Sequence, residues 1–383
     1  MAAAALPLRT NKKSGAQSPA NTPALLRLLP LLLCYGPACA GAIASLHAPT
    51  LLQVQVVTRH GAREELPKAA ADLAEGGPPL TVAGELQLTD LGAQLRAAYL
   101  TTGAPLGLPG LANYSAADAW LLSSAPDRAV TSAMSLADGL WPAGEARGGR
   151  LQVPVHTQPE RQDLTIRAYR ACPAFHADLT DLYASKAFHA EEAAHLELLQ
   201  RLAERFPDHA VLDAEEGVSY VPLERLWTVY DALAVAAEAE GSGVDPQLEA
   251  LASWVEHQRF GAAVAGPRLG ANLWEEMLGR AEAAAAAYGL GTTATEASAA
   301  HPPHRLVVFS GHYPTLLSLL ASLRLLDANP ALLADGRELP GYAAALIAEL
   351  WQEDGGSSAP FLRLRYRHGP DVLVQDALYL ELG

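Results

Sequence analysis

The chain has 383 residues, which exceeds the usual size of one compact domain, so we expect either two domains or one large core that carries an inserted lobe. Half of the residues are hydrophobic and 18% are charged, a composition that excludes a largely disordered protein. The formal net charge of −15 argues against a general binder of nucleic acid or of anionic membranes, because those surfaces attract clustered Lys and Arg. A local basic pocket remains compatible with such an acidic surface.

The first 40 residues have the layout of a secretory signal peptide. A basic region precedes an apolar segment from Ala24 to Tyr35, and Ala38-Cys39-Ala40 then stands before Gly41, so we predict cleavage after Ala40. Arg27 and Pro30 interrupt the apolar segment, which leaves an organelle-targeting peptide or an uncleaved anchor as alternatives. No other segment is long and apolar enough to span a bilayer. The expected destination is the outside of the cell or a lysosomal or vacuolar lumen.

Cleavage at this point leaves Cys172 as the one cysteine of the mature chain. We therefore expect no intrachain disulfide framework, and Cys172 is typical of a small buried hydrophobic residue. Asn113-Tyr114-Ser115 is an N-glycosylation sequon, which predicts a glycoprotein if the chain enters a eukaryotic secretory pathway.

The first predicted strand, Leu51–Val57, leads into Thr58-Arg59-His60-Gly61-Ala62-Arg63. Two arginines thus flank one histidine at the end of a strand. A neutral imidazole in that position can attack a phosphorus atom, while two guanidinium groups bind the non-bridging oxygens and neutralise charge in the transition state. The segment indicates an enzyme that handles phosphate.

The elements that follow alternate between helix and strand. Leu86, Leu91, Leu95 and Tyr99 approximate helical spacing within Gly84–Leu100, with Thr89 or Asp90 as a possible cap. Further strand-like runs end near polar residues, and this βαβ alternation predicts an α/β fold with a mainly parallel sheet. These runs are Ala119–Ser123, Leu151–His156 and Leu306–Ser310.

From about Ser185 the sequence becomes rich in alanine and glutamate. We predict a helical lobe over residues 185–299, inserted into one α/β domain that comprises residues 41–184 and 300–383. The predicted helices of the lobe are Ala187–Phe206, Leu223–Glu240, Gln247–Phe260 and Leu273–Tyr288. Near the C-terminus, Phe361–Arg367 and Val372–Val374 flank a turn and predict a hairpin.

The segment Arg59-His60-Gly61-x-Arg63 resembles the signature of the histidine acid phosphatases, the part of branch 2 of the histidine phosphatase superfamily that includes lysosomal and prostatic acid phosphatases and phytases. Further family landmarks follow in order, at Ser123–Ala133, Pro154–Thr157, Cys172-Pro173 and Phe309–His312, so the resemblance covers residues 51–383. It implies a phosphoglycerate-mutase-like fold, in which helices flank a mainly parallel sheet that carries an inserted helical lobe.

The resemblance also implies the roles of five residues. In this family the signature histidine becomes a phosphohistidine and a second histidine contacts the transferring phosphoryl group, roles that His60 and His312 take here. The substrate phosphate would be bound by Arg59, Arg63 and Arg128.

The proton donor departs from the family pattern. Tyr313 follows His312 where these phosphatases typically carry aspartate, which makes Tyr313 the third catalytic candidate. A tyrosine with an ordinary pKa of about 10 is poorly matched to proton donation at low pH. Glu64 and Glu65 are the alternatives, because the loop after Arg63 could bring either carboxylate to the leaving group.

Metal binding is not expected. His301 and His304 are separated by Pro302-Pro303, which makes the segment extended, and no set of carboxylates or cysteines accompanies them. The proposed chemistry needs no metal and no cofactor.

His156 is interpreted as a residue that fixes a loop.

The sequence thus predicts a secreted or lumenal acid phosphatase that hydrolyses phosphomonoesters through a phosphohistidine intermediate. One alternative is a catalytically impaired family member that binds phosphorylated ligands, because replacing the proton donor damages turnover before affinity. A phosphomutase is a third possibility. A sugar phosphate, a lysophospholipid, an inositol phosphate and a protein phosphate all remain open as substrates.

Overall fold

The structure is a computed structural model that describes residues 49–65, 76–101, 103–104, 106–108, 110–142, 152–213, 217–261, 266–288, 303–328, 339–353, 359–370 and 375–381. The predicted signal peptide and its Ala40 cleavage site lie outside these residues, as does His301. All elements described below belong to one compact unit, His47–Gly383. In the part of the chain that is described, none of the helices is long and apolar enough to cross a membrane.

A mixed sheet forms the centre of the fold, with the strand order β3-β2-β6-β1-β7-β8-β9. The four strands from β3 to β1 run parallel, and β7, β8 and β9 extend the sheet by antiparallel pairing. The predicted α/β class is therefore confirmed. The strands are β1 (Thr50–Arg59), β2 (Ala119–Ser123), β3 (His156–Thr157), β6 (Leu306–Gly311), β7 (Ala345–Gln352), β8 (Phe361–Arg367) and β9 (Gln375–Glu381).

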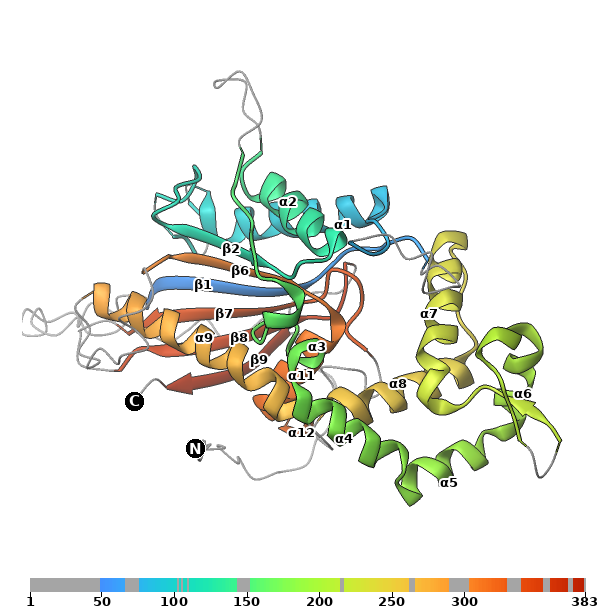
Figure 1. The fold of residues 1–383 in the computed structure, drawn as a ribbon. Helices are drawn as coiled ribbons and strands as arrows, with labels where there is room; N and C mark the ends of the chain where they lie inside the picture. Colours follow the sequence, from blue (N-terminus) through green and yellow to red (C-terminus); the bar gives the residue numbers. More distant parts are fainter. Residues whose placement is uncertain are drawn as a thin grey trace, which may run out of the picture. The chain divides into compact units, whose positions relative to one another are not determined.

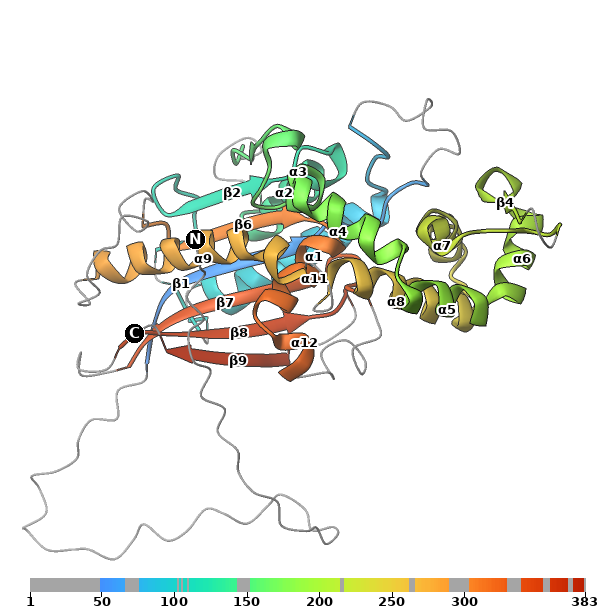
Figure 2. The same ribbon diagram turned by 60° about the horizontal axis from the view of Figure 1, so that its bottom comes forward.

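Helices cover both faces of this sheet (Figures 1 and 2). On one face, α1 (Val82–Leu95) and α2 (Asp127–Leu140) pack on side chains such as Val56, and on the other α9 (Gly266–Ala287) and α11 (Tyr313–Ser322) pack on side chains such as Val57. Because both faces are covered, β1 is buried without interruption from Leu51 to Thr58, Gln53 and Gln55 included, instead of alternating between buried and exposed residues.

Three expectations about local structure are corrected. The first helix begins about two turns earlier than Thr89 or Asp90 would require, because Thr81 is the N-cap and its side chain accepts a hydrogen bond from the backbone N–H of Gly84. Its last predicted turn, Arg96–Leu100, is π-helical. Of the strand predicted at 151–156, His156 alone among the described residues 152–156 pairs with β2, and the strand continues to Thr157.

The helical segment after β3 begins before residue 185 and divides more finely than predicted. The helix expected over 187–206 is two helices that meet at His195. The helices are α3 (Ala168–Ala171), α4 (Pro173–Tyr183), α5 (Lys186–Ala194), α6 (Leu196–Arg205), α7 (Leu223–Glu240) and α8 (Pro246–Phe260), with α12 (Leu325–Ala328) after α11, the 3₁₀ turns Glu160–Gln162 and Pro207–His209, and the short hairpin of β4 (Val211–Leu212) and β5 (Ser219–Tyr220).

Helices α5 to α8 share a separate hydrophobic cluster that includes Phe188, Leu199, Leu226 and Leu251. Helix α9 instead contributes its apolar side chains to the core on the sheet. A lobe with boundaries at 184 and 300 stays a prediction, and by its packing α9 belongs with the sheet.

Candidate active site

Three neighbouring strand ends bring the motif residues together. Strand β6 lies between β1 and β2, and all three run parallel, with Arg59 opposite Gly311 and Ser123 opposite Ser310. His60 and His312 each follow the last residue of their strand. The backbone N–H of His60 donates to the carbonyl oxygen of Gly311 at 3.0 Å, and the centroids of the two imidazole rings are 5.2 Å apart. Segments about 250 residues apart in sequence thus meet at one edge of the sheet.

All six residues identified from the sequence border one cavity of about 380 Å³ at this edge. They are Arg59, His60, Arg63, Arg128, His312 and Tyr313. Arg167, Arg170 and Arg259 add three more guanidinium groups to its wall, so the cavity is strongly cationic within an acidic protein. Such a charge distribution suits an anionic ligand.

The surroundings of His60 fix its tautomer. Its Nδ1 lies 2.8 Å from the carbonyl oxygen of Gly61, which can only accept, so Nδ1 carries the proton and Nε2 carries the lone pair. Burial, followed by the charges of Arg128 and Arg59, holds the pKa of His60 well below its ordinary value. Nε2 lies 3.4 Å from Nε of Arg128. His60 is therefore a neutral imidazole whose free nitrogen faces an arginine.

Gly61 is required by close packing of the loop that follows His60. A Cβ atom on Gly61 would lie 2.3 Å from the carbonyl oxygen of Gly84, and one on Gly84 would lie 2.1 Å from that of Ala62. The loop is held further by Gln87, whose side chain accepts from the backbone N–H of Ala62 at 2.9 Å. The first turns of α1 thus fix the backbone between His60 and Arg63.

Each of the three predicted phosphate-binding arginines is positioned differently. Arg59 donates to the carbonyl oxygen of Pro340 at 2.7 Å, and its guanidinium carbon lies 4.1 Å from the ring centroid of Tyr342. Arg63 donates from Nη2 to Oδ1 of Asp231 at 2.5 Å. Arg128 is in the first turn of α2, and burial, followed by the charge of Arg63, lowers its pKa to about 10, which leaves it charged at neutral pH.

His312 is the N-cap of α11, where its backbone N–H donates to Oγ1 of Thr315 at 3.2 Å. Its Nε2 is 2.9 Å from Oγ of Ser124, at the end of β2. Burial, and then the charges of Arg128 and of His60, hold the pKa of His312 well below its ordinary value. Two neutral histidines therefore lie side by side at the ends of adjacent strands.

The hydroxyl of Tyr313 is directed to a buried carboxyl group. It lies 2.5 Å from Oε2 of Glu256, to which Arg259 donates on the other oxygen at 2.8 Å. Burial and then the charge of Glu256 raise the pKa of Tyr313 well above its ordinary value, and burial also raises the pKa of Glu256. The ring of Tyr313 packs against Trp227, with the centroids 4.5 Å apart.

The alternative carboxylates of the sequence analysis, Glu64 and Glu65, are exposed and are not among the described residues that border the cavity. Asp231 of α7 does border it and is 4% exposed. Arg167, which is 6% exposed and pairs with Glu160 at 2.9 Å, was also missed. No motif in the sequence includes Arg167. Asp231 could have been identified, because it is a carboxylate on the apolar face of the predicted helix 223–240.

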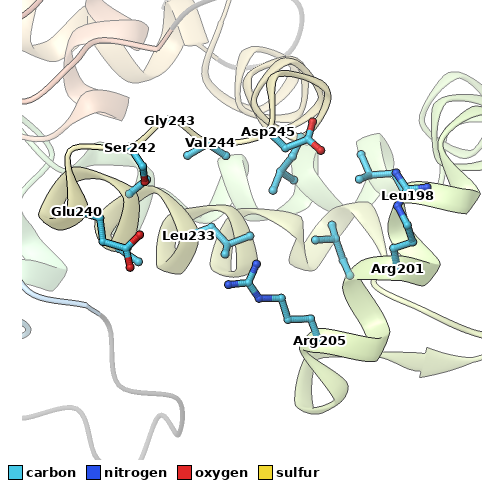
Figure 3. A pocket seen from close by; sticks show the side chains of 13 residues that line it. Leu198, Arg201, Arg205, Leu233, Glu240, Ser242, Gly243, Val244 and Asp245 are labelled. Atoms are coloured by element: carbon cyan, nitrogen blue, oxygen red, sulfur yellow. The ribbon is translucent and has the colours of Figure 1, made fainter.

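A second cavity of about 380 Å³ lies between α6, α7 and the loop before α8 (Figure 3). Arg201 and Arg205 project from α6 at its rim, with Glu240 and Asp245 on the other side. Neither histidine nor cysteine is among its described lining residues. Within the described part of the chain, no group of three or more His, Cys, Asp or Glu side chains is arranged to hold a metal ion.

Comparison with known proteins finds sequence similarity to histidine phosphatases. The family model of the histidine phosphatase superfamily, branch 2, matches residues 65–238, a range that includes Arg128 and Asp231. Testicular acid phosphatase of Mus musculus is 28% identical over 351 residues, covering 85% of this chain and 70% of the mouse protein. Its counterpart from Homo sapiens is 29% identical over 337 residues, covering 80% of this chain and 70% of the human protein.

Solved phytases share the fold. The phytase of Klebsiella sp. ASR1 superposes with a TM-score of 0.54 at 15% identity, covering 86% of this chain and 88% of the phytase. The apo form of Hafnia alvei phytase superposes with a TM-score of 0.53 at 14% identity, covering 83% and 84% of the two chains.

Proposed function

We propose that this chain is a member of branch 2 of the histidine phosphatase superfamily, a phosphomonoester hydrolase of the histidine acid phosphatase type that acts through a phosphohistidine on His60. The observation that carries this proposal is the fixed tautomer of His60, whose unprotonated Nε2 faces the arginines of the cavity. A buried neutral imidazole with a free nitrogen is the form that a nucleophile requires.

In the proposed reaction, Arg59, Arg63 and Arg128 bind the non-bridging oxygens of the phosphoryl group. The Nε2–P bond of His60 forms as the bond from phosphorus to the leaving oxygen breaks, and a proton donor protonates that oxygen. Water then attacks phosphorus, the P–N bond breaks, and inorganic phosphate and free His60 are released. His312, whose ring centroid lies 5.2 Å from that of His60, contacts the transferring group as well.

We further propose that the protein is secreted or resides in a lysosomal or vacuolar lumen, on the basis of the predicted signal peptide. The side chain of Asn113 in the sequon is exposed, which supports glycosylation at that position. The functional unit is proposed to be the α/β domain of residues 41–184 and 300–383, with α7 and α8 from residues 185–299 supplying one wall of the cavity.

A catalytically impaired member that binds phosphorylated ligands is the second candidate. One observation favours it, since the residue in the proton donor's usual place is Tyr313 and its hydroxyl is bonded to Glu256. An enzyme without a donor would lose about 10²–10⁴-fold in rate on alkyl esters, whose leaving oxygen needs a proton. Aryl esters would lose much less.

The two candidates are separated by phosphate release from an aryl and an alkyl phosphate at acidic to neutral pH, with His60→Ala beside the unchanged protein. The hydrolase requires turnover that disappears in His60→Ala. A folded protein that binds phosphate without His60-dependent turnover on either ester would instead be the binding member. The exposed histidine of α5, His189→Ala, serves as the matched control for loss of one histidine.

A further inference from the structure

Asp231 supplies the only carboxylate among the described residues that border the cavity. We propose, resting on the proposed function, that Asp231 is the general acid of the reaction and replaces the aspartate that Tyr313 displaces from the end of β6. The proton donor would then come from α7, in the helical part of the chain, and not from the strand edge that carries His60 and His312.

The two oxygens of this carboxylate have different surroundings. Oδ1 receives the hydrogen bond from Nη2 of Arg63 at 2.5 Å. Oδ2 is buried and has no hydrogen-bond partner among the described residues. Leaving a buried carboxylate oxygen unpaired is costly, and such an atom is expected to be used by a ligand or in the reaction. Arg63 therefore orients the carboxyl group and leaves Oδ2 unpaired.

The other candidate donors are engaged or distant. The hydroxyl of Tyr313 is bonded to Glu256, and Glu256 itself is held by Arg259 and does not border the cavity. Glu64 and Glu65 are exposed outside it. Among these described carboxyl groups, Asp231 alone is buried, belongs to the cavity wall and has an unpaired oxygen.

In the proposed reaction, one proton leaves Asp231 and a second proton later returns to it. In the proposed step the carboxyl group of Asp231 carries its proton on Oδ2, the oxygen that Arg63 does not bind. That proton passes to the leaving oxygen as the bond to phosphorus breaks, and the resulting carboxylate is stabilised by Arg63. The same oxygen then removes a proton from the water that attacks the phosphohistidine, which restores the starting form.

The test compares Asp231→Asn with the unchanged protein on a series of aryl and alkyl phosphates of increasing leaving-group pKa, with kcat/KM as the readout. Asparagine keeps an acceptor for Arg63 but cannot donate the carboxyl proton. We expect kcat/KM to fall by about 10²–10⁴-fold on alkyl esters and by less than about tenfold on the most acidic aryl ester. The exposed Asp181→Asn on α4 is the matched control and should leave the whole series unchanged.

Asp231→Glu retains an acid and should restore alkyl hydrolysis above the level of Asp231→Asn. If the asparagine variant does not fold, the same ester series is measured on Asp231→Glu, in which the displaced acid should lower kcat/KM more on alkyl than on aryl esters. Equal losses on all esters, or no loss on any, would overturn the assignment, because a residue that only orients Arg63 does not sense the leaving group. Loss on alkyl esters in Tyr313→Phe or Glu64→Gln but not in Asp231→Asn would overturn it as well. The proposed function fails separately, when the unchanged protein itself shows no turnover that depends on His60.

Discussion

At the scale of single residues, the decisive property of the site is the protonation of His60. Its Nδ1 is committed to the carbonyl oxygen of Gly61, and burial among arginines disfavours a second proton on Nε2. Attack by Nε2 therefore requires that His60 stays neutral at a pH where an exposed histidine has become an imidazolium.

This requirement can be measured by NMR of protein labelled in its histidines, with the His60 signals assigned by their absence from His60→Ala. Because burial lowers the pKa of His60, we expect the signals of the neutral Nδ1–H tautomer to persist at pH 5. A titration midpoint of about 6.5 for His60, the ordinary value for histidine, would contradict its role as the nucleophile.

The sequence predicted most of this site because its residues follow strand ends. Arg59, His60 and His312 come directly after apolar runs, and parallel strands bring their carboxyl ends to one edge. Asp231 could not be placed in the same way, since its position depends on how α7 packs across the cavity. The hydroxyl direction of Tyr313 likewise depends on Glu256, 57 residues away in sequence.

At the scale of elements, the first turns of α1 hold the loop between His60 and Arg63. Thr81 caps the helix, and the backbone N–H of Thr81 also donates to the carbonyl oxygen of Ala62 at 2.9 Å. Gly84 allows α1 to approach that same oxygen. A side chain at Gly84 would therefore displace the catalytic loop.

Gly84→Ala tests this contact, because the new Cβ atom would lie 2.1 Å from the carbonyl oxygen of Ala62. We expect a loss of about 1–3 kcal/mol in the free energy of unfolding, together with reduced phosphatase activity in the protein that remains folded. Gly243→Ala, in an open loop where no atom lies within 4 Å of the new Cβ, is the matched control. Equal denaturation midpoints for Gly84→Ala and the unchanged protein would contradict this role of α1.

The sequence predicted best those helices and strands that are long or that have residues typical of a start or an end at their boundaries. The helix predicted at Leu223–Glu240 and the strand predicted at Ala119–Ser123 have the same bounds in the structure. Strand β7 was not identified, although all of its residues are buried, because a short apolar run does not distinguish strand from helix. The cap of α1 was misplaced because the first turn of that helix, with Val82 and Leu86 exposed, carries little apolar periodicity.

At the scale of the whole molecule, the active site reduces stability in acid. Burial lowers the pKa of both His60 and His312, so the unfolded chain binds protons at these positions that the folded chain does not bind. The free energy of unfolding therefore decreases as the pH falls below about 6.5, the ordinary pKa of histidine. Their contribution is fully present above that pH.

We expect each of these two histidines to cost up to about 2 kcal/mol in the free energy of unfolding at pH 5 relative to pH 7.5. His60→Gln and His312→Gln should accordingly show a weaker loss of stability between these pH values, measured by denaturant unfolding. His189→Gln, at an exposed position on α5, is the control for removal of one histidine. The pH dependence would have another origin if all three variants followed the unchanged protein.

The net charge of the chain and the arginines of the cavity together indicate an anionic ligand. A chain of net charge −15 concentrates Arg59, Arg63, Arg128, Arg167, Arg170 and Arg259 around one cavity, so anions are attracted to that place and not to the surface in general. This arrangement fits a small phosphate ester.

The central claim is that a phosphoryl group is transferred to His60. The most direct test is to mix the protein with an aryl phosphate carrying a labelled phosphoryl group, stop the reaction with alkali within a turnover, and locate the label by peptide mapping. Phosphohistidine survives alkali, so we predict the label on the peptide that contains His60 and its absence in His60→Ala. Turnover without a labelled protein, or a label on a peptide other than that of His60, would contradict the account.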